Sequence, residues 1–225
     1  MRSGPDPVLT APGPVALVGA GPAPAAALEA CLARSGPVVA ADGGAAAVLA
    51  AGRIPDVVIG DLDSIGSRAR AAVPPGRLHR VAEQDSTDFE KCLARIDAPL
   101  VLAAGFLGGR ADHALAALSA LARGVGPPCV LVSERDAACH VPARLTLDVP
   151  AGTRVSLFPM GPVTGVSEGL RWPIAGLSFA PAGRVGTSNE AVGPVRLSMD
   201  GPGMLAIVPA DMLDALLGGL VPRTP

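Results

Sequence analysis

Aspartates concentrate in three short motifs in the first half of the chain. They read Ala-Asp-Gly-Gly at 41–44, Gly-Asp-Leu-Asp-Ser at 60–64 and Gln-Asp-Ser-Thr-Asp at 84–88. Gathering carboxylates costs free energy, because like charges at short range raise each other's pKa. A hard cation such as Mg²⁺, which prefers oxygen ligands and often binds together with a phosphate, offsets that cost. The motifs therefore predict an acidic, metal-dependent phosphate site.

The first two motifs follow apolar runs that are expected to be strands. Asp42 directly follows the run at 38–41, and Asp61 directly follows a similar one. In open parallel sheets ligands bind in the crevice beyond the carboxyl ends of the strands, so both side chains are expected there. Asp61 and Asp63 are two residues apart, which in extended chain places both side chains on one side. The alternative for this pair is a turn in which Asp63 or Ser64 caps the next segment.

The third motif is expected to begin a helix. Thr87, with Glu90 three residues later, matches a capping box. Asp88 and Lys91, the only lysine of the chain, then share one helix face at i and i+3. An exposed ion pair between them is the alternative. Beside Gly-Asp-Leu-Asp-Ser, the pattern favours a metal-binding carboxylate next to a phosphate-binding lysine.

The segment Gly-Gly-Arg-Ala-Asp-His at 108–113 opens another predicted helix. Its two glycines allow close approach of the backbone to a ligand, and a helix N-terminus attracts anions. Arg110 adds a bidentate donor for phosphate. Asp112 is open to two interpretations, a site residue or simply the N-cap, and His113 is expected to be structural.

Two features of the second half can bind a small molecule. The segment 169–173 holds the only tryptophan, Trp172, which is either a core residue or a stacking platform for a flat heteroaromatic ring. Thr187-Ser-Asn-Glu190 offers hydrogen-bonding side chains in what is expected to be a glycine-flanked loop.

Apolar runs alternate with helical patterns up to about residue 135, which indicates an α/β, Rossmann-like domain with a mostly parallel sheet. Strands are expected at 15–18, 38–41, 57–59, 78–81, 100–102 and 130–132, and helices at 25–34, 45–51, 87–96 and 112–123. Beyond that point, short runs separated by turn residues predict an all-β sandwich. These runs lie at 143–149, 154–158, 176–179, 195–199 and 204–208, before a last helix at 212–217. The expected domains are residues 1–135 and 136–225.

Composition excludes several classes of function. The net charge is -2 and no Lys/Arg tract occurs, so the footprint of a nucleic-acid binder is missing. The four cysteines form no CxxC pair and are expected to be reduced, buried thiols of a cytoplasmic protein. Residues 7–28 carry no charge, but prolines and glycines interrupt them, so we expect a buried strand and a helix rather than a targeting segment or membrane span.

Taken together, the motifs resemble those of the thiamine pyrophosphokinase family. They occur in the family's order and with similar gaps over roughly residues 15 to 208. The matching segments are ADGGA at 41–45, PDVVIGDLDS at 55–64, QDSTDFEK at 84–91, GGRADH at 108–113, GLRWP at 169–173 and SNE at 188–190. Arg171 stands where many members have lysine, and the final dozen residues match nothing in the pattern.

The resemblance implies an ATP- and Mg²⁺-binding catalytic domain followed by a β-sandwich domain for thiamine binding and dimerisation. It implies a homodimer with active sites between subunits, which transfers the diphosphoryl group of ATP to thiamine and releases AMP. Carried over to this sequence, the implied metal ligands are Asp61, Asp63 and Asp88, supported by Asp42 and Asp85. The implied ATP contacts are Gln84, Thr87, Lys91 and Arg110, with Asp112 nearby. The implied thiamine pocket is lined by Trp172, Ser188 and Asn189.

Other functions compete with this interpretation. A diphosphokinase of the same fold could act on another alcohol, such as a pterin, although GLRWP and SNE belong to the thiamine-binding half of the pattern. A DxD nucleotidyl- or glycosyltransferase would leave those C-terminal motifs unexplained. A non-catalytic thiamine or nucleotide sensor would not need every carboxylate of the pattern.

Overall fold

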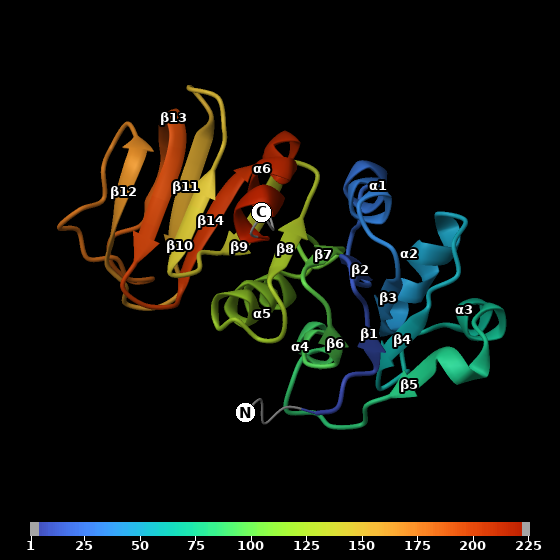
Figure 1. The fold of residues 1–225 in the computed structure, drawn as a ribbon. Coiled ribbons are helices and arrows are strands. Elements are labelled where there is room, and N and C mark those ends of the chain that lie inside the picture. The colour runs from blue at the N-terminus through green and yellow to red at the C-terminus, as the bar shows by residue number, and fades with distance from the viewer. Residues whose placement is uncertain (1–4, 222–225) are drawn as a thin grey trace. The chain divides into compact units, whose positions relative to one another are not determined.

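The computed structural model describes residues 5–221, and the chain divides into two compact units (Figure 1). The first unit runs to Ala120 and includes Val125–Glu134. The second consists of Leu121–Gly124 and the chain from Arg135 onward. The acidic motifs lie in the first unit, and the segments 169–173 and 187–190 lie in the second.

Parallel strand pairs form the sheet of the first unit, in the order β8-β7-β2-β3-β4-β5. Every residue of β2, β3, β4, β7 and β8 is buried, as expected for apolar strands that are covered on both faces. The strands are β2 (Val15–Val18), β3 (Val38–Ala41), β4 (Val57–Gly60), β5 (Leu78–Arg80), β7 (Val101–Ala104) and β8 (Cys129–Val132). A separate parallel pair joins β1 (Leu9–Thr10) to β6 (Ile96–Asp97).

Helices pack against this sheet: α1 against β2, β7 and β8, and α4 against β3 and β4. The helices of the first unit are α1 (Ala25–Ala33), α2 (Ala45–Ala50), α3 (Ser67–Ala72), α4 (Asp88–Leu93) and α5 (Ala111–Ala122). The expected helix at 87–96 ends early, because Ile96 leaves it to pair with β1. The helix α3 was not expected, because its Ser-Arg-Ala-Arg-Ala-Ala sequence has no apolar stripe.

The second unit is β-rich, and the strand pairs within it are antiparallel. Its long strand β13 pairs with β11 through its first half and with β10 and β12 through its second half. The elements are β9 (Asp136–His140), β10 (Arg144–Leu147), β11 (Arg154–Pro159), β12 (Gly165–Leu170), β13 (Gly186–Met199), β14 (Met204–Pro209) and the helix α6 (Leu213–Leu220).

Two expectations for the second half are wrong, and one strand of it was not expected. Residues 176–179 form no strand, and Phe179 makes only an isolated bridge to Val163. The strand β12 was missed, since glycines at both ends of its pattern obscure the alternation of buried and exposed residues. The segment 187–190 is part of β13 rather than a loop, because its backbone pairs with β11.

All four cysteines are free and buried, as predicted. Burial raises the pKa of the Cys31 and Cys139 thiols to about 12, so neither is a reactive thiolate at neutral pH. Among the described residues, no helix combines the length and the apolar character that crossing a bilayer requires.

Candidate active site

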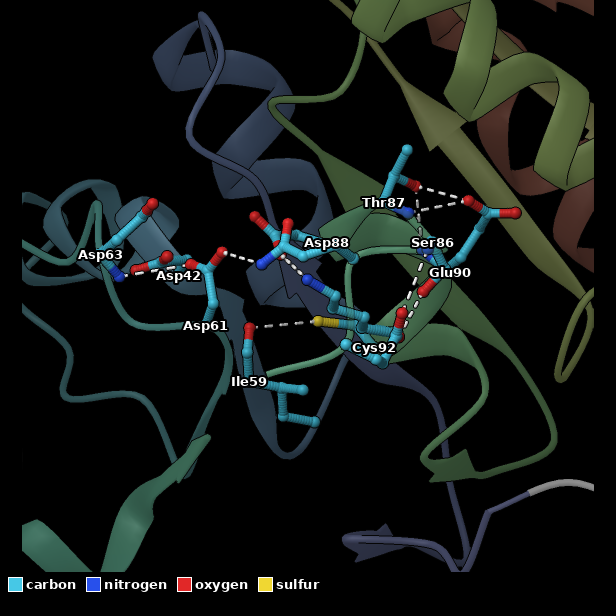
Figure 2. Close-up of polar contacts among 12 residues, drawn as sticks. Asp42, Ile59, Asp61, Asp63, Ser86, Thr87, Asp88, Glu90 and Cys92 are labelled. Atoms are coloured by element: carbon cyan, nitrogen blue, oxygen red, sulfur yellow. Dashed lines mark hydrogen bonds and ion pairs between the residues drawn. The ribbon is translucent and has the colours of Figure 1, made fainter. Parts of the chain in front are cut away.

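Three aspartates of the first unit form an acidic cluster. One carboxylate oxygen from each of Asp42, Asp61 and Asp63 lies within 4.8 Å of the others. Figure 2 shows these three side chains side by side. Asp42 is buried and Asp63 is exposed, so the cluster extends from the end of the sheet to solvent. Asp88, which the family pattern places among the metal ligands, is outside this group of three.

Asp42 reaches the cluster through an unusual backbone. It follows β3 and begins a short 3₁₀ turn, η1 (Asp42–Gly44), with a φ of 42°. Two glycines make room for it. A Cβ on Gly60 would lie 2.8 Å from the Asp42 Cβ, and a Cβ on Gly44 would lie 2.0 Å from the Val18 carbonyl oxygen. The tight glycine-containing turn therefore presses Asp42 against the end of β4, where Asp61 follows.

Asp61 and Asp63 are brought together by a turn rather than by extended chain. Leu62 between them has a φ of 66°, in the left-handed region. The Asp63 N–H donates to Asp61 Oδ1 at 3.3 Å, and Arg70 Nη2 donates to the Leu62 carbonyl at 2.8 Å. The extended geometry expected for this pair is wrong, because the reversal at Leu62 sets the side-chain directions. A turn and a carboxylate cluster are both present, but neither Asp63 nor Ser64 caps the next helix, because the N-cap of α3 is Gly66.

The charged form of the Asp42 carboxyl is disfavoured in the folded protein. Desolvation raises the pKa of its carboxyl from 3.8 to about 6, with a further contribution from the Asp61 and Asp88 carboxylates. Its Oδ2 accepts from the Ser64 N–H at 3.2 Å. Within residues 5–221, its Oδ1 is a buried oxygen with no hydrogen-bond partner. A buried, unpartnered carboxylate oxygen next to two further carboxylates fits a bound hard cation.

The Asp61 carboxylate is held in its charged form. The Asp63 N–H and the Gln84 side chain, whose Nε2 lies 3.3 Å from Asp61 Oδ2, lower the pKa of Asp61. Asp42 and Asp61 therefore differ in protonation behaviour, although they are neighbours.

A pocket of about 580 Å³ lies over the carboxyl ends of these strands. Its wall contains six of the site residues expected from the sequence: Asp61, Gln84, Thr87, Asp88, Lys91 and Arg110. Asp42, Asp63, Asp85 and Asp112 are not in the wall, although Ala41 and Gly43 on either side of Asp42 are. The volume is within the usual range for small-molecule sites.

The start of α4 agrees with the predicted capping box. The Thr87 hydroxyl accepts from the Glu90 N–H, and the Glu90 carboxylate accepts from the Thr87 N–H at 3.0 Å (Figure 2). Lys91 is only 3% exposed, and its Nζ lies 3.4 Å from Asp88 Oδ1. The ion pair that we considered as an alternative thus exists, but its lysine is buried and lines the pocket.

Arg110 and Asp112 form an exposed ion pair. Arg110 Nη2 lies 2.6 Å from Asp112 Oδ2, and both side chains are largely exposed. This hydrogen-bonded pair lowers the pKa of Asp112 to about 2. Asp112 is not the N-cap of α5, since the helix already begins at Ala111. Arg110 lines the pocket, and its partner Asp112 does not.

Sequence reasoning missed one residue of the pocket wall and one residue that supports a neighbouring loop. Phe106 lies in the wall and packs on Phe89, with ring centroids 4.6 Å apart. Its only signal is its place two residues after the apolar strand β7, close to the strand end as Asp42 and Asp61 are. Glu83 holds the loop before α4, because its carboxylate accepts from the Asp85 N–H, the Ser86 N–H and the Ser86 hydroxyl. These bonds lower the pKa of Glu83.

Trp172, Ser188 and Asn189 are neighbours within the second unit. Trp172 is 56% exposed and therefore not a core residue. Asn189 is buried, and its side chain bonds to the Trp172 backbone. Ser188 has a φ of 61°, the left-handed conformation, near the start of β13.

The geometry of the first unit defines a class of site. Two carboxylates, Asp61 of the acidic cluster and Asp88, border one pocket at the carboxyl ends of parallel strands, together with a buried lysine, an exposed arginine and glycine turns. Such an arrangement can hold a polyanionic ligand together with a hard cation, and can offset charge that develops during phosphoryl transfer.

Comparisons with known proteins agree with this class and make it specific. The protein-family model described as "Thiamin pyrophosphokinase, catalytic domain" matches residues 28–130. A second family model, described as "Thiamin pyrophosphokinase, vitamin B1 binding domain", matches residues 142–203. Together these matches span most of the chain and both units. The chain belongs to the thiamin pyrophosphokinase family.

Similar proteins are known from plants, yeasts and bacteria. Thiamine pyrophosphokinase 1 of Oryza sativa subsp. japonica is 30% identical over 154 residues, which cover 60% of this chain and 58% of the relative. The chain thus spans less than two thirds of that relative's length. The solved thiamin pyrophosphokinase of Candida albicans has a TM-score of 0.72 at 15% identity and covers 87% of this chain and 90% of its own. That of Geobacillus thermodenitrificans has a TM-score of 0.71 at 24% identity, covering 87% and 96%. At these identities the likeness shows a shared fold.

Proposed function

We propose that this protein transfers the diphosphoryl group of ATP to the hydroxyl of thiamine, giving thiamine diphosphate and AMP. The observation that carries the proposal is the acidic cluster, whose Asp61 lies in the wall of the same pocket as buried Lys91, within the segment that matches the family's catalytic model. The segment that matches the vitamin B1 binding model contains exposed Trp172.

Asp42, Asp61 and Asp63 are the residues best placed to hold Mg²⁺. This set differs from the one that the family pattern implied, because it includes Asp42 in place of Asp88. Its support is the distance between the carboxylates and the unpartnered Oδ1 of Asp42. When bound, Mg²⁺ neutralises charge on phosphate oxygens and polarises the phosphorus under attack. Asp88 is left to hold Lys91, whose ammonium it contacts.

The other residues of the pocket bind and orient the triphosphate. Lys91 and Arg110 supply positive charge at the wall, and the glycine-rich turn before α5 lets the backbone come close to phosphate oxygens. Gln84 orients the Asp61 carboxylate. Asp85 is exposed and bonded through its backbone to Glu83, so it remains a candidate for orienting the thiamine hydroxyl. No residue needs to form a covalent intermediate, since positioning and charge neutralisation account for most of the catalysis of phosphoryl transfer.

We further propose the finer features of the family for this chain. The first unit is an ATP- and Mg²⁺-binding Rossmann-like domain over residues 1–135. The second is a sandwich domain over residues 136–225 that binds thiamine and forms a homodimer, with Trp172 and Ser188 at the thiamine pocket. The buried free cysteines fit a reducing, cytoplasmic location.

The test is product analysis after incubating the purified protein with ATP, Mg²⁺ and thiamine. AMP and thiamine diphosphate should appear in equal amounts, and only when all three components are present. ADP in place of AMP would show attack at the wrong phosphorus and contradict the proposal. AMP release with a pterin alcohol but not with thiamine would reassign the substrate, and ligand binding without any turnover would indicate a sensor.

A further inference from the structure

Trp172 is an exposed residue of a loop whose backbone is held by hydrogen bonds. The loop follows β12, and Trp172 is 56% exposed. Packing of the ring contributes little to the order of an exposed tryptophan. Other contacts must therefore hold its backbone if the ring is to keep one position. Those contacts come from the neighbouring strand β13.

The Asn189 side chain provides most of these contacts. Its Oδ1 accepts from the Trp172 N–H at 3.2 Å and from the Glu190 N–H at 2.8 Å, and its Nδ2 donates to the Trp172 carbonyl at 2.7 Å. Both lone pairs of the amide oxygen are therefore used, and one of the two N–H groups as well. Asn189 is only 7% exposed, so it has little remaining capacity to bind a ligand.

The strand β13 is irregular next to Asn189. The register of β11 against β13 shifts at this point, and Ser188 takes the left-handed conformation with φ 61°. The Ser188 N–H donates to the hydroxyl of Ser156 at 3.0 Å, and Ser156 is itself buried. Register irregularities of this kind redirect side chains, and here the neighbouring Asn189 side chain meets the Trp172 loop. The irregular register at Ser188 and the hydrogen bonds from Asn189 to the loop therefore lie next to each other in β13.

A second pair of contacts orients the ring. Arg171 Nη1 lies 3.3 Å from a Glu190 carboxylate oxygen, and its guanidinium carbon lies 5.2 Å from the centre of the Trp172 ring. The guanidinium therefore covers one face of the indole as a cation–π contact. Trp172 nevertheless stays 56% exposed, so part of its surface is open to a flat ligand.

We propose that Asn189 is a positioning residue, which holds the Trp172 backbone so that the indole is ordered before a ligand arrives. Asn189 itself does not contact the ligand. The part of the inference that names thiamine as the ligand rests on the proposed function. The part that concerns the order of Trp172 stands on the hydrogen bonds alone.

The composition of the chain makes this inference directly testable. Trp172 is the only tryptophan and the chain has no tyrosine, so near-ultraviolet fluorescence reports this one side chain. Asn189→Ala removes all three hydrogen bonds, whereas Asn189→Asp keeps the size and the acceptor but loses the donor to the Trp172 carbonyl. Glu168→Gln is the matched control, since it weakens only an exposed ion pair with Arg196 on the same pair of strands.

Time-resolved fluorescence anisotropy should show a larger fast, local motion of Trp172 in both Asn189 variants, and no change in the control.

If the ordered fraction of the loop falls to about a tenth, the apparent Kd for thiamine rises about tenfold, because affinity scales with the fraction of molecules in the binding-competent state. Thiamine affinity is measured by isothermal titration and the KM for ATP by turnover, and the latter should stay within about twofold. Far-UV circular dichroism checks that each variant is folded. If Asn189→Ala does not fold, the same measurements are made on Asn189→Asp.

Two results would overturn the inference. Weak thiamine binding with unchanged Trp172 anisotropy would make Asn189 a direct ligand, and increased Trp172 motion with unchanged thiamine affinity would make it merely structural. Failure of the proposed function is recognised separately, because the wild-type protein would then neither bind thiamine nor release AMP. In that case the anisotropy of the three variants still decides whether Asn189 orders Trp172.

Discussion

Replacing Asp42 by asparagine should make the metal-free protein more stable while abolishing its activity. Asp42 is 2% exposed, its Oδ1 lacks a partner among the described residues, and two further carboxylates lie beside it. Asparagine keeps the shape, tolerates the left-handed φ of 42° and can still accept from the Ser64 N–H. It removes the charge that burial disfavours.

The magnitude follows from the pKa of Asp42. Folding raises this pKa from 3.8 to about 6, and each unit corresponds to about 1.4 kcal/mol, which sets an upper limit of about 3 kcal/mol. Because the cluster opens to solvent at Asp63, screening should reduce the effect, and we expect about 1–2 kcal/mol.

The sign of the pH dependence can be worked out in the same way. Below pH 3.8, Asp42 is protonated in both the folded and the unfolded state, so it adds no electrostatic penalty. Between that pH and about 6 the unfolded state loses the proton first, so the folded state binds more protons and its stability falls as the pH rises. Above that range the penalty is constant. The advantage of Asp42→Asn should therefore be largest at pH 7–8 and vanish towards pH 4.

The assay is urea unfolding in EDTA across this pH range, followed by far-UV circular dichroism. Emission of Trp172 marks unfolding of the second unit and separates it from that of the first. Asp97→Asn, at an exposed position of the first unit, is the control and should change little. Millimolar Mg²⁺ should stabilise the wild type but not Asp42→Asn. The reasoning is refuted if the variant is no more stable than the wild type at pH 8, or if its advantage grows as the pH falls.

Four other substitutions test separate parts of the site. Asp63→Asn should abolish AMP formation with an unchanged circular dichroism spectrum, since it removes a ligand charge from an exposed position; full activity would exclude Asp63 from the site. Lys91→Met should lower kcat/KM for ATP roughly 10- to 100-fold, as expected for loss of a charged contact, and an unchanged value would make Lys91 structural. Thr87→Ala removes the cap of α4 and should cost about 1 kcal/mol in urea unfolding, with Ser86→Ala as a comparison. Trp172→Ala should raise the KM for thiamine more than the KM for ATP, and equal effects on both would argue against a thiamine-specific role.

Features with a local cause could be read directly from the sequence. The apolar runs that became β2, β3, β4 and β8 are buried strands because burial on both faces requires continuous apolar residues. The capping box at Thr87 is likewise local, since its partners lie within one helical turn. The ordered motifs were sufficient to identify the family, and they placed Asp61, Lys91 and Arg110 on one pocket.

Other features depend on contacts between distant segments or on single backbone dihedrals, which no local pattern encodes. The grouping of Asp42 with Asp61 and Asp63 required left-handed residues at 42 and 62 and a glycine at the end of β4. The use of the Asn189 amide for the Trp172 backbone required the register of β13 against its neighbours. The sequence by itself therefore determined which residue types are available for phosphate and metal chemistry. Tertiary structure decided which carboxylates meet and which polar side chain is already occupied, because hydrogen-bond partners and desolvation are set by strand register and backbone reversal.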